Sequence, residues 1–352
     1  MSSKPHILML VGSYTTVEMS ELSELYARGC ERALGEHFRF TTLYRAPTDG
    51  RWLVGDSVDT VRNSEPMSFA EAAERLSGER FAASLPQMFC VPGMTTGRER
   101  LLELGMPMIG NRSDTMAMGA NKAEARAVAA AAGLNVPEGA VVPQGQEPAA
   151  LPDFPVIVKP VASDNSEGLS LVRAEAQLRT ALSLAHVQGD ALVERFIPPG
   201  RELRVGVVEW QGRLRALPPE EYPVDPKHHP IRLKGDKLGR GATGAMRLMA
   251  KTKAGAWIVD ESDPAIPALH DAALRAFRAM DCRHYGLFDF RVDDAGTPWF
   301  LEAGLYCSFS PDSVVAAMAR AGGIALPDLL HGLAGTGARP VPATRQDTVE
   351  AA

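Results

Sequence analysis

Short apolar runs alternate with helical apolar spacing along the first third of the chain. Residues 6–12 (HILMLVG) form a continuous apolar run, which is typical of a strand buried on both faces. Residues 17–34 have the apolar spacing of a helix, and residues 40–46 and 86–93 each predict a further strand. A helix that stops at Gly105 is followed by a short strand. Strands that alternate with helices predict a parallel α/β domain over residues 1–115.

The next part of the chain predicts a compact α+β unit over residues 116–190. Residues 111–133 have a polar start and then a long Ala-rich stretch, which predicts one helix that stops at Gly133. Strands are predicted at 138–143 and 154–160. Residues 162–172 then predict a loop of small residues that leads into another strand. The unit ends with a predicted helix at 174–186.

The third region, 191–334, opens with a predicted strand (ALVERFI) and continues with two strands joined by a tight turn at Gln211-Gly212. Residues 218–255 predict a long loop, and loops of this length are often functional. An amphipathic helix, a hairpin and two closing helices follow. Residues 335–352 are polar, and we expect them to be a disordered tail.

The predicted hairpin carries two acids on strands that are otherwise apolar. A turn over residues 293–296 would place Asp289 opposite Phe300 and make Glu302 its diagonal neighbour on the same face, about 7 Å away. Two carboxylates so arranged suit a shared hard cation. A register shifted by one residue would put them on opposite faces. The alternative interpretation is two strand-end acids that face water.

Other charges follow apolar strands in the middle of the chain. Lys159 ends the run VIVKP, where an ammonium is costly to bury without an anion, and Lys122 begins the Ala-rich helix. The small-residue loop after Lys159 has backbone N–H groups that suit phosphates. Glu194 and Glu202 flank RFIPPGR and could line a purine slot through their acceptor oxygens. Solvated lysines and surface acids around a turn are the alternative interpretation.

Composition narrows the class of protein without identifying it. A chain of 352 residues suits two or three domains, and the net charge of −6 argues against a nucleic-acid partner. No apolar run reaches the ~18 residues that span a membrane, and the N-terminus does not have the pattern of a secretory signal. We therefore expect a cytoplasmic protein with no membrane or nucleic-acid partner. Its cysteines form no CxxC pair and are expected to be buried thiols: Cys30, Cys90, Cys282 and Cys307.

The order of these motifs resembles a known superfamily. Lys122 is followed by PVIVKP with its small loop, then by ALVERFIPPGRELRV, and then by FDFRV and WFLEAG. This order resembles the ATP-grasp superfamily, most closely its D-alanine–D-alanine ligase branch. Motifs carry the likeness over residues 85–335, and architecture alone carries it over the first 85. The resemblance implies an α/β (α+β) ATP-grasp fold of three domains, with the nucleotide between the central and C-terminal domains.

The resemblance also implies roles for individual residues. Asp289 and Glu302 would bind magnesium, with Glu302 bridging two ions. Glu194 would meet the adenine amine and Glu202 the ribose, while the backbone of Ile197 would hydrogen-bond the ring. The residues implied to bind ATP are Lys122, Lys159, Ser166, Gly168, Glu194, Phe196, Ile197 and Glu202, with Lys234 or Lys237 at the γ-phosphate.

The departures from the family pattern gather at its amino-acid site. Gly304 stands where the family has a metal-binding Asn, and Leu287 stands where it has an Arg against the oxyanion, for which Arg291 could compensate. Thr16 replaces a substrate-binding Glu, although Glu18 is close by. The candidate catalytic residues are Glu302, Ser308 and Arg291. The candidate substrate-binding residues are Thr16, Glu18, Pro92, Gly93, Leu287, Gly304, Ser308 and Ser313.

The leading hypothesis is an ATP- and Mg²⁺-dependent carboxylate–amine ligase that acts through an acyl-phosphate. Because the substrate positions differ, we expect amino-acid-like substrates other than plain D-alanine. The product would be a dipeptide or a lactam of specialised metabolism, such as antibiotic biosynthesis. The alternatives are a non-catalytic ATP-binding homologue, an ATP-grasp kinase and a binding module of the periplasmic type. A homodimer is common in the family that the chain resembles.

Overall fold

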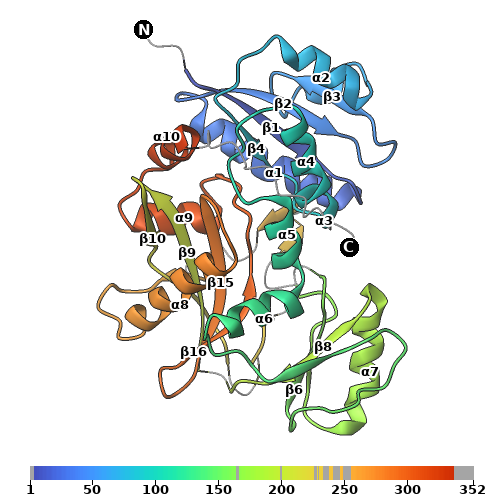
Figure 1. Cartoon of the computed structure of the whole chain (residues 1–352), viewed down its shortest axis with the longest axis vertical. Helices are drawn as coiled ribbons and strands as arrows, with labels where there is room; N and C mark the ends of the chain where they lie inside the picture. Colours follow the sequence, from blue (N-terminus) through green and yellow to red (C-terminus); the bar gives the residue numbers. More distant parts are fainter. Residues whose placement is uncertain are drawn as a thin grey trace, which may run out of the picture.

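The computed structural model describes residues 4–163, 166–198, 200–225, 228, 230–232, 238–240, 246–248 and 255–336. Lys234, Lys237 and nearly all of the predicted tail lie outside these residues. Figure 1 shows the N-terminal sheet at the top, a second large sheet below it, and a smaller sheet with β6 and β8 at the bottom. The mixed α/β class predicted from the sequence is confirmed.

The N-terminal sheet has the order β3-β2-β1-β4, in which β1 is parallel to β2 and β4 while β3 is an antiparallel edge. The helix predicted at 17–34 is confirmed, and the Thr16 hydroxyl caps its first turn. The elements are β1 (His6–Gly12), α1 (Val17–Leu34), β2 (Arg39–Arg45), β3 (Trp52–Gly55), η1 (Val61–Asn63), α2 (Phe69–Ser77), β4 (Ala83–Pro86), α3 (Val91–Met94) and α4 (Thr96–Glu103).

The strand predicted at 86–93 is wrong. The strand β4 ends at Pro86, and the chain leaves the sheet and forms the short helix α3, which has a proline in its first turn. Met88 and Phe89 remain buried, which explains the strand-like apolar run. The short strand predicted after Gly105 is reduced to a single bridge between Ser84 and Met108.

The Ala-rich helix begins at Lys122 and stops before Gly133 as predicted, but the polar start before it forms a separate helix, and the chain breaks between the two at Asn121. Asn121 is extended and caps a second helix, since its side-chain oxygen accepts from the backbone N–H groups of Ala123 and Glu124 at 3.1 and 3.2 Å. The break makes Lys122 the first helical residue, and its own N–H donates to the Val161 carbonyl at 2.9 Å. The two helices are α5 (Ser113–Ala120) and α6 (Lys122–Ala131).

The central sheet is antiparallel throughout and has the order β5-β8-β6-β7. The strand β8, which the sequence assigns to the C-terminal region, pairs within this central sheet. The helix α6, which the sequence assigns to the central unit, packs instead into the core of the C-terminal sheet. We therefore propose a central domain from about residue 137 to 197. The elements are β5 (Gly139–Val142), β6 (Val156–Pro160), β7 (Ser170–Val172), α7 (Glu175–Ala185), η2 (His186–Gln188) and β8 (Ala191–Arg195).

The C-terminal sheet has the antiparallel order β14-β11-β9-β15-β16, with β10 beside β9. The turn at Gln211-Gly212 is confirmed, with both residues at positive φ. The described residues of the region predicted as a loop at 218–255 include three short strands. The elements are β9 (Arg201–Trp210), β10 (Arg213–Ala216), β11 (Glu220–Tyr222), β12 (Leu238–Arg240), β13 (Met246–Leu248), β14 (Trp257–Ile258), α8 (Ile266–Ala279), β15 (Tyr285–Val292), β16 (Pro298–Ala303), α9 (Val314–Ala321) and α10 (Leu326–Thr336).

Alternation along β9 and β15 gives the C-terminal sheet two different faces. One face, with Leu203 and Phe288 among its residues, packs against α8 and α6. The other face is polar near its centre and carries Glu202, Arg204 and Asp289. This polar part of the sheet lies opposite α8 and α6, whereas α9 and α10 pack on the same face farther along, around Val208 and Leu287.

The hairpin of β15 and β16 differs from the predicted register by one residue. The Asp293 carboxylate accepts hydrogen bonds from the backbone N–H groups of Ala295 and Thr297. These bonds hold a turn that is one residue longer than the predicted one. Phe290 therefore pairs with Phe300, and a β-bulge follows. The bulge reverses the orientation of the next residues, and Asp289 pairs directly with Glu302. The two carboxylates thus share a face, as direct cross-strand partners and not as the diagonal neighbours that were predicted.

No single helix of the described residues is long and apolar enough to span a membrane. One bent pair, Val314–Ala321 with Leu326–Gly335, passes the same length and composition test when its two helices are taken together.

Candidate active site

Two adjoining cavities lie over the polar face of the C-terminal sheet. The smaller has a volume of about 100 Å³ and lies between the central sheet and β15–β16. The larger has a volume of about 640 Å³ and reaches from the same strands to the N-terminal helix α1. The residues that line both cavities are Lys122, Ser163, Glu167, Arg232, Asp289 and Glu302.

The smaller cavity brings together most of the residues that the sequence assigned to ATP. Gly168 is not among the described residues that line it, but a Cβ there would lie 2.8 Å from Pro160, so the loop needs glycine to pass this close. The predicted residues on its wall are Lys122, Lys159, Ser166, Glu194, Phe196, Ile197, Glu202, Asp289, Arg291 and Glu302.

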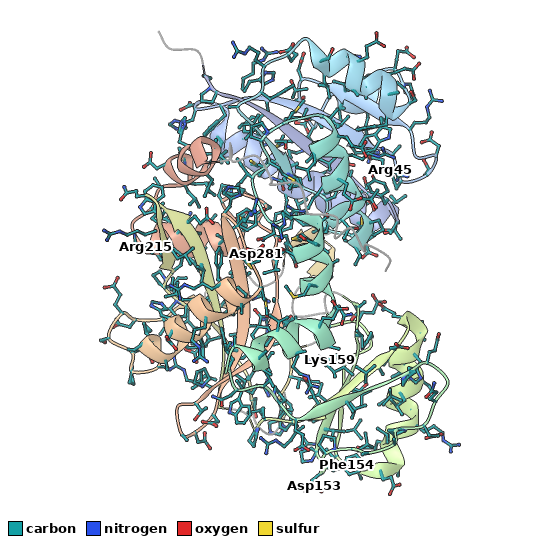
Figure 2. The ribbon with its side chains drawn as sticks, in the orientation of Figure 1. Arg45, Asp153, Phe154, Lys159, Arg215 and Asp281 are labelled. Atoms are coloured by element: carbon teal, nitrogen blue, oxygen red, sulfur yellow. The ribbon has the colours of Figure 1, made fainter. Side chains whose placement is uncertain are left out.

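One wall of the smaller cavity carries a buried ion pair. Lys159 on β6 donates to the Glu194 carboxylate on β8, and the two residues are only 8% and 3% exposed. They are diagonal neighbours on one face, since Glu194 pairs with Ile157. Figure 2 shows Lys159 on the side of the lower sheet nearest to the rest of the molecule. Lys122 is tethered beside it, since its ammonium donates to the Ser163 carbonyl.

The opposite wall is organised by Arg291. Its guanidinium donates to the Glu202 carboxylate at 2.8 Å and to the Ile197 carbonyl at 3.2 Å, and lies 5.4 Å from the centre of the Phe196 ring. Arg291 is not among the described residues that line the larger cavity. The structure therefore does not bring it to the predicted substrate residues, where we had expected it to compensate for the arginine missing at Leu287.

The larger cavity contains, beside Asp289, a cation that sequence reasoning missed. Arg204 on β9 donates through Nε and Nη2 to both carboxylate oxygens of Asp289. Burial alone would lower the pKa of the Arg204 guanidinium, but the Asp289 carboxylate holds that pKa well above its usual range. The strand pattern RELR gave a signal, because Arg204 lies two residues after Glu202 and so on the same face.

Asp289 and Glu302 fit a magnesium ion that is shared with phosphate oxygens. Within the described part of the chain, no group of three or more His, Cys, Asp or Glu side chains is arranged to hold a metal. Mg²⁺ is commonly held by one or two carboxylates together with substrate phosphates, so two opposed carboxylates at the mouth of the smaller cavity suffice. Arg204 uses one lone pair on each oxygen of Asp289, so the ion would either share those oxygens with the guanidinium or displace it.

The larger cavity collects nearly all the residues predicted to bind substrate: Thr16, Glu18, Pro92, Leu287, Gly304, Ser308 and Ser313. Gly93 is not on its described lining and packs against Met88, where a Cβ would come within 2.5 Å. Apolar residues that the sequence did not single out also line it, among them Met19, Tyr26, Phe89, Met116, Leu305 and Tyr306.

Several hydroxyls of this cavity already have structural partners. Thr16 caps α1 by accepting from the Met19 N–H at 3.2 Å, and Ser313 caps α9 in the same way. The Ser308 side chain accepts from the Ser310 N–H at 3.3 Å. Gly304 differs, since a Cβ there would meet only Leu287, at 3.9–4.0 Å, which is ordinary contact. The structure thus has room for a side chain at the position of the missing Asn.

Comparison with known proteins agrees with this geometry. Residues 143–334 match the family described as D-ala D-ala ligase C-terminus. A D-alanine–D-alanine ligase from Mycolicibacterium gilvum is 31% identical over 304 residues, which are 81% of this chain and 80% of that protein. One from Geobacter sulfurreducens is 30% identical over 244 residues, which are 66% of this chain and 69% of that protein.

Solved structures show the same fold. The VanG D-Ala:D-Ser ligase from Enterococcus faecalis has a TM-score of 0.74 at 18% identity, over 95% of this chain and 100% of that one. The D-alanine–D-alanine ligase from Coxiella burnetii has a TM-score of 0.72 at 19% identity, over 96% and 94%. The ATP-grasp fold predicted from the motifs is confirmed. The chain belongs to the D-alanine–D-alanine ligase family of the ATP-grasp superfamily, whose members are ADP-forming ligases that make C–N bonds.

Proposed function

We propose that this protein is an ATP- and Mg²⁺-dependent carboxylate–amine ligase for amino-acid-like substrates larger than D-alanine. The observation that carries the proposal is the direct pairing of Asp289 with Glu302 where the two cavities meet. A metal held there would lie between a nucleotide in the smaller cavity and a substrate in the larger one. That position neutralises the charge that develops as a phosphoryl group is transferred.

The smaller cavity supports the nucleotide half of the proposal. Lys122 and Lys159 would contact phosphates, with the loop of Ser166 and Gly168 above them. Glu194 would accept from the adenine amine, and Glu202 would bind the ribose. A solved relative of the same fold, the D-alanine–D-alanine ligase from Bacillus anthracis, was crystallised in complex with ATP (TM-score 0.68, 15% identity).

The family to which the chain belongs supports a reaction that passes through an acyl-phosphate. A substrate carboxylate oxygen attacks the γ-phosphorus, the bond between that phosphorus and the β–γ bridging oxygen breaks, and ADP leaves. The amine of the second group then attacks the carbonyl carbon. A C–N bond forms, the amine loses a proton, and the C–O bond breaks to release phosphate. The protein mainly positions the reactants and stabilises developing negative charge.

The size and lining of the larger cavity support a substrate with a sizeable apolar part. D-alanine has a single methyl side chain, whereas this cavity of about 640 Å³ has an apolar wall that includes Tyr26, Phe89 and Met116. Ligand sites of this kind use apolar walls with a few polar groups to fix orientation. We propose a role in specialised metabolism, such as antibiotic biosynthesis, in the cytoplasm. The family resemblance also supports a homodimer, which light scattering would test.

A second candidate function is a nucleotide-binding homologue without turnover. Gly304 and Leu287 favour it, since neither supplies the polar side chain expected of the family at these positions. A kinase that phosphorylates a carboxylate or hydroxyl is a third candidate. All three predict ATP binding, so binding alone does not distinguish them.

ADP release with pooled D- and L-amino acids, including bulky apolar ones, would test the proposal. The expected result is Mg²⁺-dependent ADP release with a product whose mass is the sum of two substrates, or one substrate for a lactam, less one water. A gain of one phosphoryl group would instead indicate a kinase. Tight ATP binding with no release for any substrate would refute the ligase and favour the non-catalytic homologue.

A further inference from the structure

Arg204 occupies a position that nucleotide binding does not explain. It lies on β9 between Glu220 on β11 and Asp289 on β15, and Glu302 on β16 follows Asp289 in the same row. These four residues form a cross-strand row with one positive and three negative groups. Arg204 lines the larger cavity and is not among the described residues that line the smaller one.

The other described cations of the larger cavity have other partners, although Arg232 lies over the same Tyr222 ring as Arg204. Lys122 is tethered to the Ser163 carbonyl at the nucleotide end. Arg232 stacks on the Tyr222 ring at 3.5 Å and lies 3.7 Å from the Glu202 carboxylate. Arg204 is thus the described cation of the larger cavity that bonds directly to Asp289. Its planar fork suits a carboxylate, which it would contact through two parallel hydrogen bonds.

Magnesium binding would change the partner of Arg204. The ion needs oxygen ligands from Asp289, yet Arg204 engages both of those oxygens in the described structure. If binding of the ion turned an oxygen of Asp289 away from Arg204, N–H groups of the guanidinium would lose their acceptor. The guanidinium is only partly buried and borders the larger cavity, so a substrate oxygen in that cavity could replace the lost acceptor.

We propose that Arg204 exchanges partners during turnover. It holds Asp289 before magnesium binds, and afterwards it binds the substrate carboxylate, the carbonyl of the acyl-phosphate and the oxyanion formed when the amine attacks. This inference rests on the ligase function proposed above. It assigns to β9 the cationic role that Leu287 on β15 does not fill, and the two positions are diagonal neighbours because Leu287 pairs with Gly206.

The test compares Arg204→Met and Arg204→Lys with a matched control, Arg201→Met. Arg201 lies on the same strand and also makes a bidentate ion pair, with Glu221 at 2.7 and 2.8 Å, but it lines neither cavity. We expect Arg204→Met to lower kcat/KM for the carboxylate substrate by roughly 100-fold or more, since losing one oxyanion donor costs this much. The KM for ATP should change little, and Arg201→Met should keep wild-type kinetics.

A second readout does not depend on activity. Mn²⁺ titration in the presence of a non-hydrolysable ATP analogue should show tighter metal binding in Arg204→Met, because the competing guanidinium is gone. A third variant, Arg204→Met with Leu287→Arg, moves the guanidinium to the neighbouring strand, beside the space at Gly304. Its kcat/KM should be about tenfold higher than that of Arg204→Met. Circular dichroism would confirm that each variant folds.

The outcomes separate this inference from the function on which it rests. If the wild-type protein ligates but Arg204→Met and Arg201→Met have equal kcat/KM, the role of Arg204 is overturned and the ligase function stands. A double variant no better than Arg204→Met, or unchanged Mn²⁺ affinity, would also overturn the exchange. A wild type with no ligation would refute the proposed function itself, and the role of Arg204 with it.

Discussion

Removing the ammonium of Lys159 should affect stability and nucleotide binding separately. Lys159 and Glu194 are almost fully buried and bonded to each other, so Lys159→Met would leave a carboxylate without its cation. Breaking a buried ion pair from one side costs about 3–5 kcal/mol of unfolding free energy. Replacing both partners by neutral groups costs far less, so Lys159→Met/Glu194→Gln should recover most of that loss.

Nucleotide affinity should not follow the same order. If Lys159 contacts the phosphates, its loss removes a charge-assisted hydrogen bond of about 1.5–3 kcal/mol, or roughly a 10- to 150-fold weaker Kd. The double variant would regain stability but bind ATP no better than Lys159→Met. Urea denaturation measures the first quantity, and calorimetry with a non-hydrolysable ATP analogue measures the second.

Two results would refute this reasoning. If Lys159→Met unfolds at the wild-type urea concentration, the ion pair is not buried as the structure shows. If the double variant binds ATP like the wild type, Lys159 does not contact the phosphates. Arg215→Met is a suitable control, because the Arg215 side chain bonds only to the Gly322 carbonyl in the described structure and lines neither cavity.

Three further predictions concern the metal and the larger cavity. Glu302→Gln should abolish ADP release while leaving the circular dichroism spectrum unchanged, and full activity would refute the metal assignment. Gly304→Asn should fold normally and tighten Mn²⁺ binding in the presence of nucleotide by about tenfold, because it adds an oxygen ligand where a Cβ meets no close contact; unchanged affinity would show that this position does not face the ion. Burial raises the pKa of the Cys307 thiol to about 12, so the thiol stays protonated, and iodoacetamide at pH 8 should not modify it in the native protein. Rapid alkylation, read by mass spectrometry, would contradict that environment.

Local sequence signals predicted most of the helices and strands. The helix α1 has regular apolar spacing and a threonine cap, and these two signals agree. The Ala-rich helix likewise begins at Lys122 after the Asn121 cap, but the separate helix α5 before it gave no such signal. The break between the two helices is also held by the Lys122 N–H, which bonds to the Val161 carbonyl, a contact with a distant part of the chain that the sequence does not reveal.

The residues of the candidate site were found where charge interrupts an apolar strand. Lys159 and Asp289 stand out for this reason, since burying either group requires a partner. The apolar wall of the larger cavity gave no such signal. Tyr26 lies on α1 and Phe89 follows β4, and each reads as ordinary core until the fold places both beside the same space.

Arg204 was missed because its strand carries charge in the ordinary way. Along β9, polar and apolar residues alternate, so a cation on the polar face predicts only exposure to water. Its significance depends on two long-range facts: β9 pairs with β15, which places Arg204 opposite Asp289, and a bulge in β16 turns Glu302 to the same face. Neither the pairing of non-consecutive strands nor the bulge has a local signature. The side chain of Asp293, which holds the longer turn, is the nearest local cause, and it acts on Glu302 only through the register of the whole hairpin.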